Sequence, residues 1–499
     1  MRIMFYSNWE FTDLCHAFAI SFKKKYNMEN FSAIAADIQD YNFLKNQNDI
    51  IYEKLYHVFE PYENYEEEKI NDQYLDDMEE KYGIPNLWLL VYSDRDLAIY
   101  NKKHYTHDQY KKLIQRYIRF TEKILDESKP DYIIMDTIAT LPSYTLYTIA
   151  KKRGVQLRLF TPVKTTDRIG IIDNTFDDFT QISDYFRKLK NNEKKVKHTK
   201  EVNEFLNIYR NRKIESGYMQ IAKRYISKNF SLAAISKKFP KFLAQFQHYY
   251  FGYHKKQYNK IDPLSKAVLT FERYWKGHYF KFSNLFEKPH YGEQYAFFAL
   301  QLEPEMVTMV QAPMWVDQLS LIENIAKSLP INFKLYIKDH PQMVYFADRI
   351  RPTAFYHRVK KIPNVRLINP LEDSYNIIKN TKLVLTIGGT VGWEAILLKK
   401  PVIIFGTTFY RCLDSLYRCE NINELPWLIK KALKTHVHND EDLKLLLDAI
   451  YEKSFGGAYP KLYGLEGRMK IPEIISHKDF PELFEYLCQE IGLEKRKDE

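Results

Sequence analysis

The chain lacks the features that would place it across a membrane, in a disulfide framework or around structural zinc. No run of about 18 uncharged apolar residues occurs along it, so we expect no segment that spans a bilayer. Its four cysteines show no CxxC spacing, which indicates neither a zinc site nor disulfide pairing. The opening stretch MRIMFYSNWEF has no apolar core of useful length, which argues against a signal peptide. We therefore expect a protein of a reducing, cytosolic setting that is either soluble or bound at a membrane surface.

Glycine is scarce, with 16 residues among 499, whereas aromatic residues make up 15% of the chain. Hydrophobic residues at 45% and charged residues at 28% are typical of a globular protein rather than a disordered one. A chain of this length is too long for one core, so two domains with connecting helices are expected. The net charge of +10 favours an anionic partner or surface. Its sign alone does not distinguish nucleic acid, lipid headgroups and sugar phosphates.

Apolar runs alternate with helical segments in two parts of the chain. In the first part the predicted strands are Arg2–Ser7, Ser32–Ala36, Lys54–Phe59, Tyr132–Met135 and Gln156–Phe160. The alternation then gives way to long basic helical segments and resumes at Tyr295. An α/β fold with two helix-covered parallel sheets is therefore predicted. The expected parts are an N-terminal Rossmann-like domain at 1–175, a basic helical insertion or linker at 176–290, a second Rossmann-like domain at 291–440 and C-terminal helices at 441–499.

The most informative stretch lies in the second α/β part. An apolar run, Phe333–Ile337, ends on the turn Lys-Asp-His-Pro, and a later run, Leu383–Ile387, leads into Gly388-Gly389-Thr390 and a helix. A strand, a glycine turn and a helix in that order leave backbone amides unpaired at the start of the helix. An anionic phosphate is the natural ligand of such amides. A further strand at 401–403 follows at the spacing of a Rossmann half-domain, which favours a nucleotide site.

Thr390 and Glu394 lie one helical turn apart on one face of the predicted helix. Thr390 can bind a phosphate oxygen, and Glu394 lies at the depth where the ribose hydroxyls of a nucleotide would be. The glycines permit positive φ and a close approach of the backbone to a ligand. The alternative is a tight turn with a threonine cap and an acidic first turn. The spacing to the following strand favours ligand binding.

Lys338 and His340 end the earlier strand of this stretch. They place a cation and an imidazole at the carboxyl end of a sheet, where open α/β sheets bind their ligands. A rigid turn would be the simpler interpretation of an isolated His-Pro pair. Because the glycine turn should follow a neighbouring strand, we expect Lys338 and His340 to contact a phosphate, and His340 to neutralise a leaving nucleotide.

A basic, aromatic stretch between Glu215 and Asp262 contains no acidic residue. Cations beside bulky aromatic rings suit an anionic membrane surface, with the rings at headgroup depth. RNA could use the same chemistry, but no RNP or KH signature accompanies the stretch, so no nucleic-acid partner is expected. An ordinary helical linker with core aromatics is the other interpretation. The residues predicted to contact the anionic surface are Lys223, Arg224, Lys237, Lys238 and Lys241.

Candidates for acid–base catalysis come from the first α/β part. Asp136 follows a buried strand and so lies at a sheet edge, and Asp167 and Asp13 are similarly placed by pattern. Residues of this kind also serve as turn or capping residues. The adjacent pair Asp76-Asp77 is not spaced as a metal clamp, and we predict no metal site.

The motifs K-x-H-P, N-P-L-x-x, T-x-G-G-T-x-G-x-E-A and K-P-V-I-x-F-G follow one another between Tyr295 and Leu416. This order resembles the GT-B glycosyltransferases, and within them the capsular polysaccharide biosynthesis group, which includes Kdo (3-deoxy-manno-octulosonic acid) transferases. The resemblance implies two Rossmann-like domains facing a cleft, with the activated-sugar donor in the C-terminal domain and the acceptor in the N-terminal one. It also implies roles for particular residues: the donor phosphate would contact Lys338 and His340, the ribose would contact Glu394, and the phosphate or nucleotide would contact Thr386, Gly388, Gly389 and Thr390.

The chain departs from this family at Phe160-Thr161-Pro162, where many relatives carry an acidic residue. Asp136 or Asp167 would then supply the catalytic carboxylate. The prediction is a metal-independent glycosyltransferase without a cofactor. It would move a sugar from a CMP- or UDP-linked donor to a surface polysaccharide or glycolipid, in the cytoplasm or at the inner face of the membrane. A non-hydrolysing nucleotide-sugar 2-epimerase, disfavoured by the basic insertion, and a non-catalytic glycan- or lipid-binding relative are the alternatives.

Overall fold

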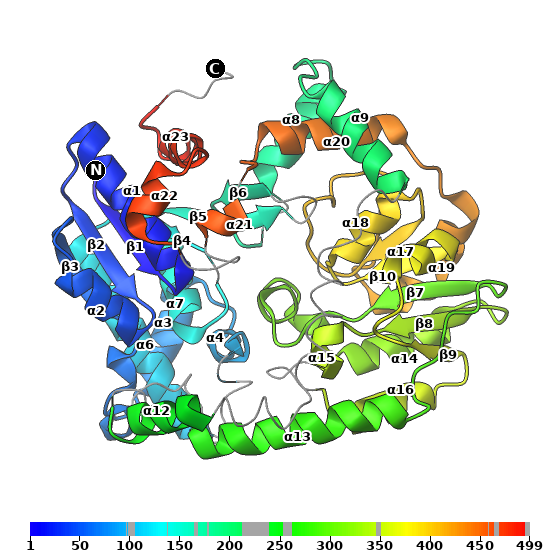
Figure 1. The fold of residues 1–499 in the computed structure, drawn as a ribbon, viewed down its shortest axis with the longest axis horizontal. Coiled ribbons are helices and arrows are strands. Elements are labelled where there is room, and N and C mark those ends of the chain that lie inside the picture. The colour runs from blue at the N-terminus through cyan, green and yellow to red at the C-terminus, as the bar shows by residue number, and fades with distance from the viewer. Residues whose placement is uncertain are drawn as a thin grey trace. The chain divides into compact units, whose positions relative to one another are not determined.

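The computed structural model describes the chain except for residues 96, 98–104, 137, 164–167, 177–178, 212–238, 253–261, 346–350, 458, 464–468 and 495–499. The chain forms two compact units (Figure 1). The N-terminal unit consists of Met1–Asp177, Tyr253–Lys260 and Lys453–Glu499. The C-terminal unit consists of Asp178–Gly252 and Ile261–Glu452.

The N-terminal unit is built on a six-stranded sheet with the strand order β3-β2-β1-β4-β5-β6. All neighbouring strands are parallel except β6, which runs antiparallel to β5. Every residue of β1 and β2 is buried, as expected for strands covered by helices on both faces. The strand order is that of a doubly wound fold, in which the winding reverses between β1 and β4. The strands are β1 (Ile3–Ser7), β2 (Phe31–Ala35), β3 (Tyr52–His57), β4 (Tyr132–Met135), β5 (Gln156–Val163) and β6 (Arg168–Ile172).

Helices from both ends of the chain cover this sheet. Phe18 of α1 packs against Phe480 of α23, with ring centroids 5.7 Å apart, and both belong to one hydrophobic core. Figure 1 shows α22 lying beside α1. The C-terminal helices therefore complete the core of the N-terminal unit. The helices of this unit are α1 (Glu10–Tyr26), α2 (Ile38–Asn46), α3 (Asp72–Tyr82), α4 (Trp88–Tyr92), α6 (His107–Ser128), α7 (Leu141–Lys152), α21 (Tyr459–Leu462), α22 (Ile471–Ser476) and α23 (Phe480–Glu490), with short 3₁₀ turns η1 (Glu60–Tyr62) and η2 (Tyr65–Glu67).

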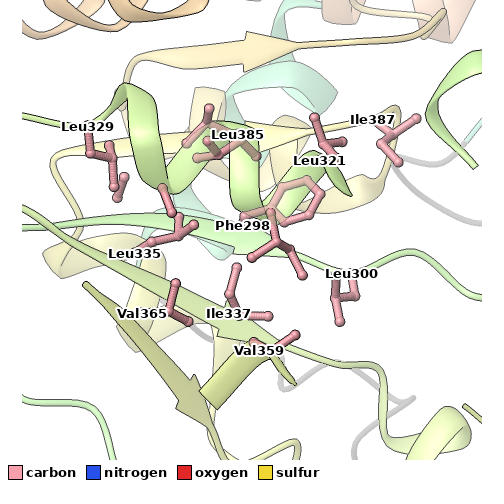
Figure 2. Close-up of a cluster of buried hydrophobic side chains, with 14 of the residues drawn as sticks. Phe298, Leu300, Leu321, Leu329, Leu335, Ile337, Val359, Val365, Leu385 and Ile387 are labelled. Carbon is pink, nitrogen blue, oxygen red and sulfur yellow. The ribbon is translucent and has the colours of Figure 1, made fainter. Parts of the chain in front are cut away.

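The C-terminal unit repeats the same winding. Its six strands have the order β12-β11-β10-β7-β8-β9, and all neighbours are parallel. The winding reverses between β7 and β10. Figure 2 shows the core on this sheet, where Phe298, Leu335, Ile337 and Leu385 meet Leu321. The strands are β7 (Tyr295–Ala299), β8 (Lys334–Lys338), β9 (Val365–Ile368), β10 (Leu383–Thr386), β11 (Val402–Ile404) and β12 (Tyr417–Arg418).

The described part of the predicted basic insertion is helical, as expected. It contains α8 (Thr180–Lys190), α9 (Thr199–Arg210), α12 (Phe239–Tyr250) and α13 (Pro263–Phe282). The predicted α/β fold with two Rossmann-like sheets is confirmed. The remaining elements of this unit are η4 (Val307–Gln311), η5 (Pro313–Trp315), α14 (Gln318–Ser328), α15 (Pro341–Tyr345), α16 (Thr353–Lys360), α17 (Ser374–Asn380), α18 (Thr390–Leu397), η6 (Ile422–Glu424), α19 (Leu425–Thr435) and α20 (Asp440–Glu452).

The expectation that the Lys338 strand and the glycine-turn strand are neighbours was wrong. Lys338 ends β8 and the glycine turn follows β10, and β7 lies between these two strands. Sequence spacing identified both strands but could not place β7, which precedes them in the chain. The carboxyl ends of three strands rather than two therefore surround the candidate site.

Candidate active site

Gln301 and Thr386 meet where the winding of the C-terminal sheet reverses. Gln301 lies just beyond β7, and its side-chain amide donates a hydrogen bond of 3.3 Å to the Thr386 hydroxyl at the end of β10. The same hydroxyl accepts a hydrogen bond of 3.1 Å from the backbone amide of Gly389. Thr386 is fully buried, so its role is to hold the glycine turn in place. The crevice outside such a switch point is where doubly wound sheets bind ligands.

The glycines of the turn are required by close packing rather than by positive φ. A Cβ atom on Gly388 would lie 2.9 Å from the Thr407 carbonyl oxygen, and one on Gly389 would lie 2.6 Å from the Gln301 amide nitrogen. Neither glycine has a left-handed backbone, which corrects one of the two reasons the sequence suggested for them. The Tyr410 hydroxyl donates a hydrogen bond of 3.0 Å to the Gly389 carbonyl. The turn is thus fixed by hydrogen bonds with Thr386 and Tyr410 and by close packing against Gln301 and Thr407.

Thr390 is the first residue of α18 and is exposed. Gly389 occupies the capping position without a side-chain hydrogen bond, so the alternative of a threonine cap is wrong. The backbone amides in the first turn of a helix have no intrahelical partners, and Gly389 has already used its amide on Thr386. The Gly392 amide bonds the Gly389 carbonyl at 3.3 Å, so the donors at this helix start are the amides of Thr390 and Val391 and the exposed Thr390 hydroxyl.

Lys338 lies at the end of β8 with 6% of its surface exposed. Its ammonium group donates a hydrogen bond of 3.0 Å to the hydroxyl of Ser374, the first residue of α17. Burial lowers the pKa of Lys338 to about 8, and the attraction of nearby carboxylates, Glu394 foremost, opposes that shift. A poorly solvated cation therefore lies at the carboxyl edge of the sheet.

Glu394 is half-buried one turn into α18. Burial raises the pKa of Glu394 to about 7, against the opposing effects of the Lys338 ammonium and of a hydrogen bond with Tyr209. Burial and the Glu394 charge likewise raise the pKa of the Tyr209 hydroxyl. Such perturbed groups, gathered at the ligand-binding edge of a sheet, are typical of functional sites.

Tyr209 comes from α9, far from the motifs in sequence. Helix α9 is fixed to α18 by Arg210, which donates a hydrogen bond of 2.9 Å to the Leu397 carbonyl. The Tyr209 ring also packs edge-on against Tyr375 at 6.0 Å. No local sequence pattern indicates Tyr209, because only tertiary packing brings it to the site. Ser374 was signalled weakly, by the capping residue Asp373 before it.

His340 is partly buried and lies two residues beyond the end of β8. Its ring nitrogen Nδ1 accepts a hydrogen bond of 3.2 Å from the Gln342 amide. A neutral ring with Nδ1 as acceptor carries its proton on Nε2. His340 is therefore suited to donate a hydrogen bond from Nε2.

A buried ionic network stabilises the turn that follows β8. Asp339 accepts hydrogen bonds from Arg351 at 3.3 Å and from the Tyr356 hydroxyl at 2.7 Å, and it accepts another of 2.7 Å from the His340 amide. Arg351 also pairs with Glu303 at 3.3 Å. Burial raises the pKa values of both Asp339 and Glu303. The turn that carries Lys338 and His340 thus depends on one buried guanidinium.

In the N-terminal unit, Asp136 directly follows β4 and is buried. The Tyr463 hydroxyl donates a hydrogen bond to its carboxylate, and the Tyr463 ring stacks on Phe11. Asp13 is buried on α1, and both carboxylates contribute to raising the pKa of Cys15, which burial raises most. Strands β1 and β4 are neighbours, so Asp136 lies at the switch point of this sheet.

Several predicted residues cannot be placed in this geometry. Asp167 lies outside the described residues, as do Lys223, Arg224, Lys237 and Lys238. Lys241 falls within α12. Among the described residues, no group of three or more histidine, cysteine, aspartate or glutamate side chains is arranged to hold a metal ion. Within the same residues, no helix combines the length and apolar character needed to cross a membrane.

Comparison with known proteins gives one match to a protein family. The family described as Capsule polysaccharide biosynthesis protein matches residues 197–415, which include Tyr209, Lys338, His340 and the glycine turn. Protein FixF of Sinorhizobium fredii (strain NBRC 101917 / NGR234) is 29% identical over 151 residues, which are 30% of this chain and 34% of FixF. The matched part thus spans about a third of that relative.

Among solved structures, the beta Kdo 2,7 transferase KpsC of Thermosulfurimonas dismutans is 13% identical, with a TM-score of 0.29 over 66% of this chain and 89% of that one. The UDP-GlcNAc 2-epimerase of Methanocaldococcus jannaschii in complex with UDP-GlcNAc and UDP is also 13% identical, with a TM-score of 0.28 over 90% of this chain and 99% of that one. The resemblance predicted from the motifs is confirmed over residues 197–415, where the chain matches the capsule polysaccharide biosynthesis family.

Proposed function

We propose that this protein transfers a sugar from a nucleotide-activated donor to a glycan or lipid-linked acceptor. The observation that carries the proposal is the convergence of Lys338, Glu394 and the start of α18 at the switch point of the C-terminal sheet. The family match covers these residues and supports a role in building a surface polysaccharide. The activity would belong to the cytoplasm or to the inner face of the cell membrane.

The donor phosphate would occupy the start of α18. There the first-turn amides, the Thr390 hydroxyl and the Lys338 ammonium offer donors to an anion. His340 would add a hydrogen bond from Nε2, and Glu394 would accept hydrogen bonds from the ribose hydroxyls. These groups are fixed before the ligand binds, so they would stabilise the charge that develops on the departing nucleotide without reorganising. No step of this scheme requires a metal ion.

The acceptor hydroxyl would be activated in the N-terminal unit by Asp136. This carboxylate lies at the sheet edge, and the hydrogen bond from Tyr463 fixes its orientation. A carboxylate held in this way can take a proton from an attacking hydroxyl. Asp136 would therefore act as the general base in place of the acidic residue that the chain lacks at Phe160-Thr161-Pro162.

Nucleotide binding can be tested by thermal shift with CMP, UDP, GDP and CDP. We expect the matching nucleotide to raise the melting temperature, because a ligand at 100 times its Kd stabilises the folded state by about 2.7 kcal/mol. Lys338→Met should lose the shift. Lys334→Met, at the opposite end of β8, should keep it. Wild-type protein that responds to none of the four nucleotides would refute the donor site.

Replacing Asp136 by asparagine should lower turnover roughly 10²- to 10⁴-fold, the usual contribution of a general base. The thermal shift by the donor nucleotide should stay at the wild-type level. Asp131→Asn is the matched control, because Asp131 is an exposed residue just before the same strand and should leave turnover unchanged. The measurement is release of free nucleotide with and without acceptor glycan. Conversion of the donor sugar into an isomer without any acceptor would instead identify an epimerase.

A further inference from the structure

Helix α13 presents a row of large apolar side chains to solvent. Leu264, Val268, Phe271, Trp275, Tyr279 and Phe282 follow one another at intervals of three or four residues, which places them on one face of the helix. All six are exposed, with Phe271 at 64%, Trp275 at 58% and Phe282 at 79%. We call this row the aromatic stripe. Soluble monomers rarely expose a contiguous apolar patch of this kind without a binding function.

The stripe lies on a helix that is anchored at one end. Phe280 points to the opposite side and is buried, with its ring 5.2 Å from Tyr356 and 5.6 Å from Phe286. The Tyr279 hydroxyl is 2.6 Å from the His357 ring. Packing of Phe280 in the core of the C-terminal unit therefore leaves the face of α13 that carries the aromatic stripe exposed to solvent. Helix α13 also packs against α15 of the same unit.

Helix α12, next to α13, also exposes apolar side chains. It packs against α13, where Lys266 donates a hydrogen bond of 3.2 Å to Gln245. Leu243, Tyr250 and Phe251 of this segment are also exposed. The aromatic character thus extends beyond a single helix.

The charges carried by helix α13 itself are mostly of one sign. Helix α13 carries four lysine or arginine residues and one acidic residue, Glu272. The preceding 216–261 contains no acidic residue at all. A second copy of the chain would bring like charges together, which costs free energy. An anionic lipid surface has the opposite charge, and its headgroup region can also accommodate the aromatic rings.

We propose that the aromatic stripe of α13 inserts into the headgroup region of an anionic lipid bilayer. A helix of 20 residues is about 30 Å long, so α13 would lie in the plane of the membrane rather than cross it. Trp and Tyr rings favour the boundary between headgroups and acyl chains, and the basic residues interact with anionic lipids. The surface is independent of the donor site, and either proposal can fail alone.

The test is flotation of the full chain with vesicles of phosphatidylcholine and phosphatidylglycerol, compared with vesicles of phosphatidylcholine alone. We expect binding to the anionic vesicles and its weakening as salt is raised. The double variant Phe271→Ser, Trp275→Ser should have a partition coefficient into anionic vesicles that is at least about tenfold lower than that of the wild type. Trp427→Ser is the matched control, because Trp427 is 71% exposed on α19 of the same unit.

Tryptophan fluorescence gives a second measurement. Anionic vesicles should shift the emission to the blue, and brominated lipids should quench it, because Trp275 enters the interface. Trp275→Phe should still bind but lose most of both signals. Equal binding of wild type and the double variant, with unchanged melting temperatures, would overturn the proposal. So would a stripe-dependent dimer that ignores vesicles.

Discussion

Replacing Lys338 by methionine should raise the Kd for the donor nucleotide roughly 30- to 1,000-fold, equivalent to about 2–4 kcal/mol. The reason is that Lys338 is a buried cation, and a phosphate beside it would replace solvation that the protein does not provide. Methionine keeps an unbranched side chain that is one atom shorter, and it removes the ammonium group with its charge and its hydrogen bond to Ser374. Isothermal titration with the nucleotide found by thermal shift measures the effect. A change below about threefold would show that Lys338 does not contact the phosphate.

The same lysine makes donor binding depend on pH. Burial lowers the pKa of Lys338 to about 8, so the empty site loses its cation as pH rises through that value. Donor affinity should fall over this range in the wild type and stay nearly flat in Lys338→Met. The contribution of Lys338 to the free energy of unfolding rises over the same pH range. Above pH 8 the unfolded chain still holds the proton that the folded chain has released. For Glu394, whose pKa is raised to about 7, stability falls as pH rises from its ordinary value to 7.

Replacing Arg351 by methionine should lower the free energy of unfolding by about 3–5 kcal/mol. Arg351 is buried between Asp339 and Glu303, and its removal leaves two carboxylates in a poorly solvated place without a cation. Urea unfolding measures the loss. Arg358→Met is the matched control, because Arg358 pairs with Glu323 at the surface and such pairs contribute about 0–1 kcal/mol.

A second substitution separates the network from simple packing. Adding Asp339→Asn to Arg351→Met should recover part of the lost stability, since one of the two uncompensated carboxylates is then removed. If Arg351→Met costs no more than Arg358→Met, or if the double variant is less stable than the single one, the network does not have the role assigned to it.

Much of the fold could be predicted because its signals are local. The strand at Tyr132–Met135 is bounded by Lys-Pro-Asp before it and Asp136 after it, and it was found with its observed bounds. Strand β6 gave no comparable signal, because its role as an antiparallel edge depends on pairing with β5 and with Phe455 far along the chain. The sequence could not show β7 lying between β8 and β10, since strand order depends on contacts distant in sequence.

The candidate site was predictable in part for the same reason. The positions of Lys338 and Glu394 follow from strand ends and helical spacing, both of which are local. Their electrostatic coupling, and the contact of Glu394 with Tyr209, arise only when α9 packs on α18. The glycine turn was identified, but the atoms that exclude a side chain there belong to Gln301 and Thr407. Their approach is a tertiary effect that no local pattern reveals.

The sharing of one core by both ends of the chain constrains how the protein is made. Phe480, Leu483 and Leu487 pack in the same core as Ile3 and Phe18. During synthesis the first sheet leaves the ribosome long before these residues do, although domains usually fold as units from the N-terminal end. The apolar face of the first sheet that α22 and α23 cover therefore stays exposed while the second unit is translated. Chaperone binding to nascent chains would be expected to last through that interval.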